Sequence, residues 1–488
     1  MRTFETDVQW IRYEVLKKVI QKTIDQSFDT TKYQIPNEIL PGNKPISRCC
    51  VYHERAIIEE RVNLASNLML PGQNIIHTIE SACDECSREH YTITDSCRGC
   101  FAQRCMQACK CGAIEKIDGK AHIDYSKCVS CGKCKEVCPF NAIVDNLKPC
   151  IRACKGKAIQ ICDDNKVKIE DEKCISCGAC VYQCPFGAIS DQSEIIPITK
   201  LIEQSRKDKN VNVYAVIAPA IVTQYTANIG QIVGAIKQIG FTDVIEAALG
   251  ADLVAYYEGK EFVERVIEGE ESCMLTSCCP AFVSYVEKQY PELVGNISTM
   301  VSPMIATRRL IKQIDDKAEV VFIGPCMAKK EEKLRYEKAG EKIYAMTFEE
   351  LEALIDAYGI NMSECTEEVL NNASYFGRSF ARTGGVSDAV ASIIETKNLP
   401  PSSYRPLVCN GLQEVDKALK ILKMRKNTFN FIEGMACVGG CIGGAACLTH
   451  DPRQNKNVEI YAKKAVEKSI NDSLRVIDYT HLDLHKPY

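Results

Sequence analysis

The sequence has no long apolar run, no large excess of charge of one sign, and no cysteine from residue 185 to 272. No stretch approaches the ~18 apolar residues that a membrane-spanning helix needs, so we expect no membrane partner. The formal net charge of -4 gives no reason to expect a nucleic-acid partner. The chain opens with Met-Arg-Thr-Phe-Glu-Thr-Asp and no apolar leader, which favours a cytoplasmic protein.

Cysteine is abundant outside that gap. The chain has 29 cysteines, in one group from Cys49 to Cys184 and another from Cys273 to Cys447. An odd number argues against a complete disulfide framework, and in a long chain without a leader we expect reduced, metal-bound thiols. The gap between the two groups indicates a change of architecture.

The first group contains an internal repeat. Segments of the form Cys-x-x-x-Ala-Ile begin at Cys109, Cys138, Cys154 and Cys184. Two runs match the C-x2-C-x2-C-x3-C-P pattern of bacterial two-cluster ferredoxins, and a third matches it with a two-residue insertion and no proline. The complete runs are Cys128, Cys131, Cys134, Cys138 and Cys174, Cys177, Cys180, Cys184; the altered run is Cys97, Cys100, Cys105, Cys109.

The spacing indicates how these cysteines divide among clusters. Three close cysteines hold one face of a [4Fe-4S] cubane, and the fourth of each run serves the neighbouring cluster. Zinc is the alternative for C-x2-C pairs, but the full runs with their trailing proline favour cubanes. The expected sets are Cys97, Cys100, Cys105 and Cys138 (set one), Cys128, Cys131, Cys134 and Cys109 (set two), and Cys174, Cys177, Cys180 and Cys154 (set three).

Cys150 and Cys184 are left over from these three sets. With the upstream pair Cys83 and Cys86 they form a candidate fourth set, so three or four accessory clusters are expected. The alternative is that Cys83 and Cys86 are structural, bind zinc or have no role. Four further cysteines have no assigned role and are expected to be small buried hydrophobes: Cys49, Cys50, Cys111 and Cys162.

The pattern of apolar residues divides the chain into four regions. Residues 1–80 show helical periodicity, with a second helix from about Glu54 to Leu68. Residues 81–145 and 146–195 form two ferredoxin-like modules. In residues 196–488, strands at 211–217 and 319–323 alternate with helices at 198–209 and 230–239, which predicts an α/β domain with mostly parallel sheets. The expected fold is thus α+β and α/β, multidomain, ending in a two-lobed α/β domain.

Three motifs in the last region carry the candidate site. They are Thr276-Ser-Cys-Cys-Pro280, Pro325-Cys-Met-Ala-Lys-Lys-Glu-Glu332 and Glu433-Gly-Met-Ala-Cys-Val-Gly-Gly-Cys441. Four thiolates from three separated segments suit one iron–sulfur cluster, and one cysteine is then spare. In parallel sheets, sites lie at the carboxyl ends of strands, where Ala218-Pro219 and Cys326 are placed.

At these residues the chain resembles the [FeFe]-hydrogenases, whose signatures TSCCP, PCxxKxxE and ExMxCxxGC occur here in order. The resemblance covers about residues 210–450, and the upstream modules resemble the family's electron relay. The surroundings differ from the commonest clostridial form: Ala281-Phe282 replaces Gly-Trp, Gly324 replaces Met, and residues 443–446 replace a glycine run with Gln-Pro. The chain therefore looks like a divergent branch of the family.

The resemblance implies an H-cluster, which is a [4Fe-4S] cubane joined to a two-iron subsite with CO, cyanide and an azadithiolate. The implied ligands of its cubane are Cys279, Cys326, Cys437 and Cys441, the last of which bridges to the subsite. Lys329 is implied as a donor to a cyanide. Other implied contacts of the subsite are Ser302, Ala218, Pro219, Met435 and Met304, where the alternative for each Met is core packing.

The spare thiol, Cys278, is implied to pass protons to the bridgehead amine, because a thiol pKa near 8.5 suits reversible transfer. The family's relay to solvent maps onto Glu258, Glu261, Arg265 and Ser298. The alternative is a solvated helix face with an i,i+4 ion pair. Glu332 is expected to support Lys329 or the region of Arg265.

The resemblance implies reversible H2 oxidation and proton reduction, with electrons from a ferredoxin or flavodoxin and with assembly by hydrogenase maturation proteins. Two alternatives are an H2-sensing relative and a hydrogenase-like iron–sulfur assembly protein, in which Cys278 and Lys329 would be unnecessary. A nickel–iron hydrogenase is excluded because residues 450–488 contain no cysteine. The sequence leaves open whether the protein is a monomer or a homo-oligomer.

Overall fold

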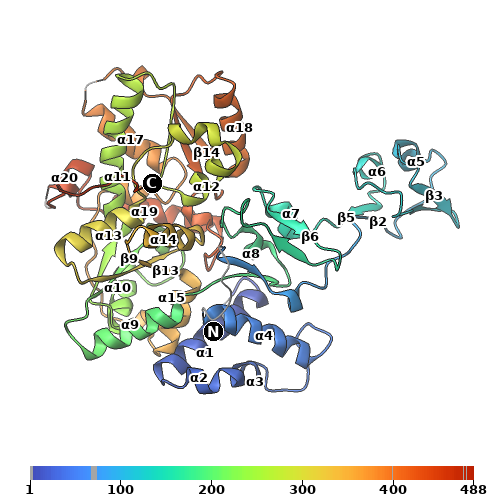
Figure 1. Cartoon of the computed structure of the whole chain (residues 1–488), viewed down its shortest axis with the longest axis horizontal. Helices are drawn as coiled ribbons and strands as arrows, with labels where there is room; N and C mark the ends of the chain where they lie inside the picture. The colour runs from blue at the N-terminus through green and yellow to red at the C-terminus, as the bar shows by residue number, and fades with distance from the viewer. Residues whose placement is uncertain (1–3, 67–73, 398, 476, 480, 488) are drawn as a thin grey trace.

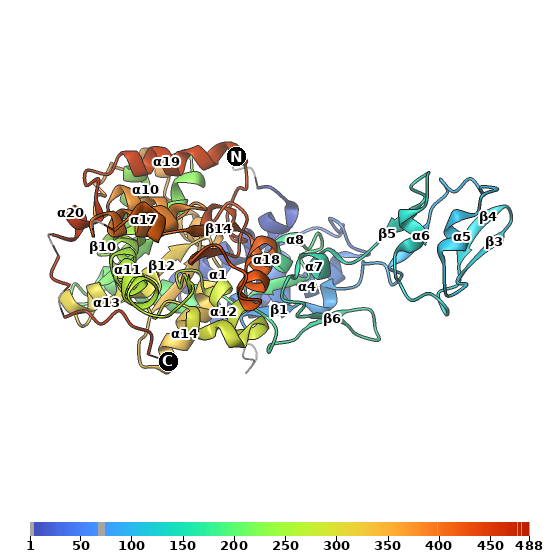
Figure 2. The ribbon, with the colours of Figure 1, turned by 90° about the horizontal axis from the view of Figure 1, so that it is seen from above.

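The computed structural model describes residues 4–66, 74–397, 399–475, 477–479 and 481–487. Most of the chain forms one body, from which the first ferredoxin-like module projects to one side (Figures 1 and 2). Helices and parallel sheets are both present, and the predicted mixed fold with ferredoxin-like modules is confirmed. Within the described residues, no helix is long and apolar enough to cross a membrane.

The N-terminal region is helical because its apolar residues recur on one face. In α1 the buried residues include Val15, Leu16, Val19 and Ile20, and this face packs against α15 of the C-terminal domain. The expected second helix is α4, and residues 67–68 of that prediction lie outside the described part of the chain. The helices are α1 (Asp7–Ile24), α2 (Phe28–Thr31), α3 (Ile35–Ile39), α4 (Val51–Ala65) and α15 (Phe348–Ala357).

The first ferredoxin-like module consists of short antiparallel strand pairs and one-turn helices. Strand β2 pairs with β5 and β3 with β4, so the two ends of the module meet where it joins the body (Figure 1). Its elements are β2 (Tyr91–Ile93), α5 (Arg104–Ala108), β3 (Ile114–Ile117), β4 (Lys120–Ile123), α6 (Lys133–Glu136) and β5 (Ile143–Asp145).

The second module lies against the body and begins earlier in the chain than predicted. Strand β1, in the region expected to be helical, pairs with β8, so Cys83 and Cys86 follow a strand of the second module rather than open the first. Long-range strand pairing of this kind leaves little local signal in a three-residue strand. The elements are β1 (Ile76–Thr78), α7 (Pro149–Ala153), β6 (Ile159–Ile161), β7 (Val167–Ile169), α8 (Ala179–Gln183) and β8 (Ile189–Asp191).

The C-terminal domain contains two parallel sheets, which are the two predicted lobes. The first has the order β10-β9-β12-β13, and the second β11-β15-β14. Buried aliphatic runs such as Val213–Ile217 make the central strands hydrophobic on both faces. The strands are β9 (Val213–Ile217), β10 (Asp243–Glu246), β11 (Met274–Leu275), β12 (Glu319–Gly324), β13 (Tyr344–Thr347), β14 (Pro406–Asn410) and β15 (Phe431–Met435).

The helices of this domain cover the sheets and place the motifs. The three motifs follow the carboxyl ends of β11, β12 and β15, so they meet at the junction of the two sheets. The helices are α9 (Ile195–Lys207), α10 (Ile229–Ile239), α11 (Ala247–Phe262), α12 (Pro280–Gln289), α13 (Pro303–Ile314), α14 (Ala328–Lys338), α16 (Tyr375–Ser379), α17 (Gly385–Glu395), α18 (Leu412–Lys423), α19 (Lys456–Lys463) and α20 (Ile470–Leu474).

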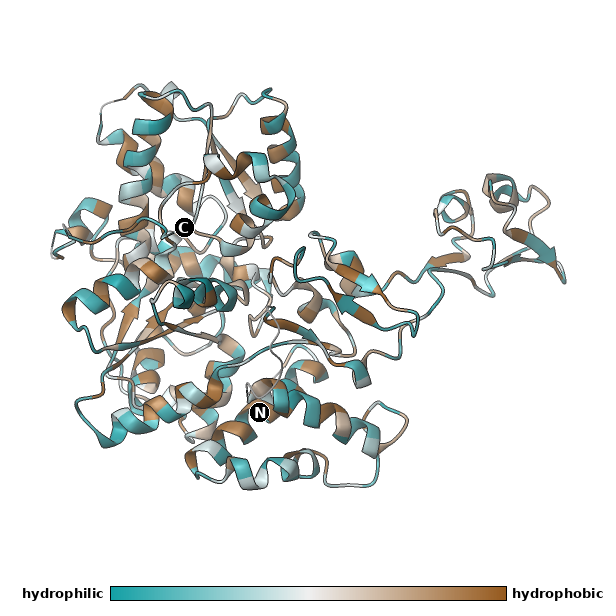
Figure 3. Cartoon of the chain, in the orientation of Figure 1, coloured by the Kyte–Doolittle hydropathy of each residue, from teal (hydrophilic) through white to brown (hydrophobic). Residues whose placement is uncertain are grey.

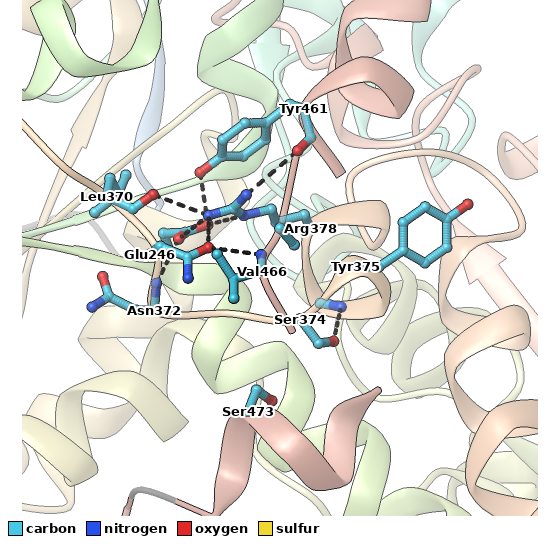
Figure 4. Close-up of polar contacts among 12 residues, drawn as sticks. Glu246, Leu370, Asn372, Ser374, Tyr375, Arg378, Tyr461, Val466 and Ser473 are labelled. Carbon is cyan, nitrogen blue, oxygen red and sulfur yellow. Dashed lines mark hydrogen bonds and ion pairs between the residues drawn. The ribbon is translucent and has the colours of Figure 1, made fainter. Parts of the chain in front are cut away.

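A buried ion pair fixes the C-terminal helices to the first sheet (Figure 4). Arg378 of α16 donates two 2.7 Å hydrogen bonds to Glu246 at the end of β10. The Tyr461 hydroxyl of α19 donates to the same carboxylate at 2.6 Å. Because both charges are desolvated and fully hydrogen-bonded, the geometry of α16 and α19 relative to the sheet is tightly specified.

Helix α14 is hydrophilic along its length although it lies inside the body (Figure 3). Three of its lysines are buried, and each has an acidic partner. Lys330 pairs with Asp191 at 2.7 Å and with Glu350 at 2.9 Å, while Lys333 pairs with Glu194. These pairs join the second ferredoxin-like module to the C-terminal domain. The third buried lysine, Lys329, faces the motif cysteines.

Candidate functional site

The cysteines of the three motifs gather between the two sheets. Burial raises the pKa of Cys326 to about 11 and that of Cys441 to about 12, and in both cases the Cys279 thiol adds to the effect. Burial raises the pKa of Cys437 as well, with Cys326 and Cys279 as its nearest charged neighbours. The four thiols implied as cubane ligands therefore share one buried neighbourhood. Cys279 is also the N-cap of α12.

These residues fit an iron–sulfur cluster. All cysteines are free of disulfides. The thiols of Cys326, Cys437 and Cys441, whose pKa values are raised by burial and by neighbouring cysteines, become favourable thiolates when iron supplies the positive charge. Among the described residues, no three His, Cys, Asp or Glu side chains are close enough to hold a single metal ion.

The surroundings of these cysteines contain polar atoms without a partner. The Ser302 and Ser277 hydroxyls are buried, and neither has a hydrogen-bond partner in the described part of the chain. Such atoms are costly unless a ligand satisfies them. Met304, Met435 and Ala218 are buried in the same core cluster as Cys278, and Pro219 begins the turn that follows β9.

Lys329 lies beside the spare cysteine. Its Nζ donates to the Cys278 carbonyl at 3.4 Å and to Glu332 Oε2 at 2.7 Å. Burial alone lowers the pKa of Lys329, but the Glu332 carboxylate outweighs this and raises it, so the side chain stays an ammonium. Of the two roles expected for Glu332, the structure places it beside Lys329.

The four expected relay residues lie together on one side of Cys278. Glu258 is fully buried, accepts a hydrogen bond from the Ser277 amide at 3.2 Å, and has one carboxylate oxygen without a partner. Glu261 accepts from Ser298 Oγ and from Arg265 Nη1, both at 2.6 Å. The i,i+4 pair is therefore present, but the two glutamates are buried rather than on a solvated helix face.

Burial also sets the protonation of this group. Burial and the nearby Glu261 raise the pKa of Glu258 to about 8. Burial, followed by the Glu258 charge, raises the pKa of Cys278 well above its usual value. Glu258 and Cys278 are therefore both neutral acids near pH 7, and each can give up or take back a proton.

The accessory sets extend outward from this site. A cavity of about 240 Å³ is lined by all four cysteines of set one. In set two, Cys128 and Cys131 are the charged neighbours of Cys134. In set three, burial and then the charges of Cys174 and Cys154 raise the pKa of Cys177. The next contribution comes from Cys326, one of the four central cysteines, which are Cys279, Cys326, Cys437 and Cys441. Set three thus adjoins the central cysteines.

Residues 211–445 match the family described as "Iron only hydrogenase large subunit, C-terminal domain", and residues 121–144 and 167–190 match "4Fe-4S binding domain". Residues 211–445 are therefore a domain of the [FeFe]-hydrogenase-like family. The chain is a hydrogenase-like iron–sulfur protein, as its motifs predicted.

Its relatives include hydrogenases and an assembly factor. The periplasmic [Fe] hydrogenase large subunit of Nitratidesulfovibrio vulgaris is 29% identical over 374 residues, which cover 66% of this chain and 85% of that protein. Iron hydrogenase 1 of Clostridium pasteurianum is 29% identical over 403 residues, which cover 70% and 67%. The cytosolic Fe-S cluster assembly factor NAR1 of Candida dubliniensis is 38% identical over 110 residues, which cover 21% and 18%.

A solved structure of a variant of [FeFe]-hydrogenase HydA1 from Chlamydomonas reinhardtii is similar over 58% of this chain and 94% of its own, with a TM-score of 0.47 and 19% sequence identity.

The residues that depart from the usual family motifs are closely packed in this hydrogenase-like domain. Phe282 is fully buried, and a Cβ on Gly434 would lie 2.4 Å from its ring. A Cβ on Gly324 would lie 2.7 Å from the Phe322 ring and 3.3 Å from Ala218 Cβ. The altered residues Phe282 and Gly324 are therefore fitted to their own neighbours, since a larger residue at Gly434 or Gly324 would displace the side chains around it.

The sequence did not reveal two charged residues near the relay. Glu271 accepts two 2.8 Å hydrogen bonds from Arg265 and is partly exposed. The series of hydrogen-bonded polar groups therefore reaches the surface at Glu271. Lys486 donates to the Ser298 carbonyl at 3.1 Å, because the C-terminal segment pairs with Met300 through His485. Neither residue belongs to a motif, and only their folded positions connect them with the site.

The cysteines without an assigned role were wrongly expected to be buried. Cys49, Cys111 and Cys162 are exposed, and Cys50 is half-buried. They lie in surface loops or turns, where the apolar neighbours that would bury them are absent.

Proposed function

We propose that this protein is an [FeFe]-hydrogenase that catalyses 2 H⁺ + 2 e⁻ ⇌ H2 in both directions. The observation that carries the proposal is the position of Cys278, a fifth buried thiol beside four cluster cysteines. A protein that only held a cubane there would need neither this thiol nor the buried ammonium of Lys329 next to it.

The protein's part in the reaction is to bind the cofactor and move protons. Cys279, Cys326, Cys437 and Cys441 would hold the cubane of the H-cluster. Lys329 and the unpartnered Ser302 hydroxyl would donate hydrogen bonds to cyanide groups. When bound, the H-cluster supplies the iron and the amine at which H2 is formed or split.

Proton movement follows the buried polar chain. Cys278 gives a proton to the cofactor and takes one from Glu258, whose unpartnered oxygen is free to accept or donate. Glu261 exchanges with Glu258 along α11 and is held in place by Ser298 and Arg265. Glu271 then connects Arg265 with solvent.

Electrons enter through the accessory clusters. Set three adjoins the central cysteines, and the projecting first module is the most accessible point for a carrier protein (Figure 2). A ferredoxin or flavodoxin is the proposed carrier, hydrogenase maturation proteins would install the two-iron subsite, and the cytoplasm is the proposed location.

The proposal is tested by maturing the full-length protein and measuring infrared absorption in the CO and cyanide stretching region together with H2 turnover. We expect both signals. Iron–sulfur clusters without either signal would contradict the proposal and favour an assembly role, which the NAR1 match also suggests. Infrared bands with negligible turnover would favour a sensing role.

The role of Cys278 has its own test. We expect Cys278→Ala to keep the infrared bands but to lose about 10²–10⁴-fold in turnover, the usual contribution of an acid–base group. Cys273→Ala is the matched control, because Cys273 is also buried with a raised pKa but lies outside the site. Equal turnover in the two variants would contradict the proton role.

A further inference from the structure

The four cysteines left over from sets one to three lie together in the second module. Cys150 of α7 is buried, and burial raises its pKa to about 12. The other charged groups that raise it are Cys184, Cys83 and Cys86. Cys83 packs both against the hydrophobic cluster that contains Cys150 and against the one that contains Cys184. Segments from three parts of the chain, after η2 (Glu80–Ala82), in α7 and after α8, therefore bring these thiols into one neighbourhood.

Cys184 also has the local geometry of the repeat cysteines in the other sets. In all four repeats the amide four residues after the cysteine donates to its sulfur, at 3.2–3.4 Å. In all four, the residue just before that amide has a left-handed backbone, as Gly187 does with φ +59°. The donors are Ala113, Ala142, Ala158 and Ala188, for Cys109, Cys138, Cys154 and Cys184.

Such amide-to-sulfur hydrogen bonds favour a thiolate and are one of the means by which proteins tune iron–sulfur clusters. Cys184 therefore accepts the same amide-to-sulfur hydrogen bond as Cys154, the fourth cysteine of set three.

Two buried cations next to this group have donors without a partner. Arg61 of α4 is 6% exposed, and its Nη2 donates to the Gly187 carbonyl at 2.6 Å. Its Nε and Nη1 have no hydrogen-bond partner among the described residues. Lys148, at the start of α7, is 2% exposed, and its Nζ likewise has no hydrogen-bond partner in the described structure. Unpaired buried cations are rare because desolvation is costly.

The charges of these cations act on three of the four cysteines, which are Cys83, Cys86 and Cys184. Lys148 is the first charged group that lowers the pKa of Cys86, and it also lowers that of Cys83, although burial raises both. Burial, reinforced by Arg12, lowers the pKa of Arg61 to about 10, and the Cys184 charge opposes this. Arg61 therefore keeps its charge at neutral pH, and neither its unpaired nitrogens nor Lys148 Nζ has a carboxylate partner among the described residues.

We propose that Cys83, Cys86, Cys150 and Cys184 hold a fourth accessory [4Fe-4S] cluster, and that Arg61 and Lys148 are its buried counter-cations. A cubane with four thiolates is a dianion when oxidised and a trianion when reduced. One electron enters and no bond or proton changes, so the two cations stabilise the reduced form more than the oxidised form.

A single zinc ion with four thiolates is also anionic, but zinc is not reduced, so metal content and reduction separate the two sites. The hydrogen-bond geometry that Cys184 shares with Cys109, Cys138 and Cys154 favours the cluster. The inference does not depend on H2 catalysis, because the cluster can be counted in an inactive protein.

The first test counts iron and sulfide in the reconstituted full-length protein. The double variant Cys83→Ser/Cys86→Ser should lose about four iron and four sulfide atoms per chain. The control Cys111→Ser/Cys162→Ser removes two exposed cysteines and should lose none. Unchanged iron in the first variant, or zinc in the wild-type site, would overturn the proposal. H2 turnover, measured separately, tests the proposed hydrogenase reaction and leaves this count unaffected.

The second test keeps all the ligands and changes only the cations. In redox titrations followed by electron paramagnetic resonance, Lys148→Gln and Arg61→Gln should each make one accessory cluster at least about tenfold harder to reduce, which is about 59 mV for one electron. Arg88→Gln is the control, because it removes an exposed cation two residues after Cys86, where solvent screens the charge. Shifts no larger than that of the control would overturn the role of the cations.

Discussion

Ser298 Oγ donates a 2.6 Å hydrogen bond to Glu261 Oε2. Glu261 Oε1 in turn accepts from Arg265, so both carboxylate oxygens are fixed. Glu258, one turn earlier on α11, has one oxygen without a partner. The outer part of the proposed relay is thus held rigidly, whereas its inner carboxyl keeps a free oxygen toward the site. We therefore expect the inner residue to be the more sensitive to replacement of its acid group.

The first prediction compares two buried carboxyls of α11. We expect Glu258→Gln to keep the clusters but to lower H2 turnover about 10²–10⁴-fold, because the amide has the shape of the acid but cannot pass a proton. Asp252→Asn is the matched control: Asp252 is equally buried and also has a raised pKa, but contacts Ser374 and Ser473.

The control should keep wild-type turnover. If both variants were equally slow, the effect would come from α11 packing rather than from proton transfer, and infrared spectra of the matured variants would show whether the cofactor is intact.

The second prediction concerns the buried pair Lys329–Glu332. Glu332→Gln leaves the ammonium without its carboxylate, and we expect a loss of about 3–5 kcal/mol in the free energy of unfolding. Glu331→Gln, at the preceding position, removes a partner of the more exposed Arg335 and should lower the free energy of unfolding by at most about 1 kcal/mol. Denaturant titrations of the two variants measure the difference, and equal losses would show that Glu332 does not hold Lys329.

Much of the site could be predicted because its chemistry depends on short segments. The cluster cysteines, Lys329 and Cys278 lie within motifs whose spacing is set by one turn of chain around a cofactor. The parallel strands that precede these motifs were visible as buried aliphatic runs such as residues 319–323.

What could not be predicted depends on contacts between distant segments. Glu271 joins the relay only through Arg265, and Lys486 only through the pairing of His485 with Met300. Strand β1 was missed because three residues that pair with β8 have no periodicity of their own. Arg61 and Lys148 belong to no motif. They become candidates only because the structure shows that both side chains are buried and have nitrogens without a hydrogen-bond partner among the described residues.

The third prediction concerns the contact between set three and the central cysteines. A Cβ on Gly178 would lie 2.5 Å from Met327 Sδ and 2.9 Å from Ala445 Cβ, and the backbone there has φ +77°. We expect Gly178→Ala to move the second module away from the domain, which should cost about 1–3 kcal/mol and slow electron transfer to the site.

Gly340→Ala isolates the backbone contribution, because its φ is +86° but no atom lies within 4 Å of the added Cβ. It should cost about 1 kcal/mol and leave turnover unchanged. H2 turnover with a reduced ferredoxin as donor is the measurement, and equal turnover in the two alanine variants would show that the contact does not limit electron transfer.

The last prediction uses pH to probe Asp252, which accepts hydrogen bonds from Ser374 and Ser473, two of the residues labelled in Figure 4. Burial raises the pKa of Asp252 to about 7, against the hydrogen bonds from Ser374 and Ser473 that lower it. In the unfolded chain an aspartate has a pKa near 3.9. Between about pH 4 and pH 7 the folded protein therefore binds more protons than the unfolded chain, and its stability falls as pH rises.

Asp252→Asn removes this titration but keeps an oxygen that can accept from both serines. The free energy of unfolding of the variant, relative to wild type, should therefore rise from about pH 5 to about pH 7 and level off above the folded-state pKa. Asp388→Asn is the control, because the ion pair of Asp388 with Arg382 is exposed to solvent. Denaturant midpoints at several pH values measure both differences. A difference for Asp252→Asn that did not change with pH would mean that this carboxyl is ionised throughout the range, and that the serines compensate its burial fully.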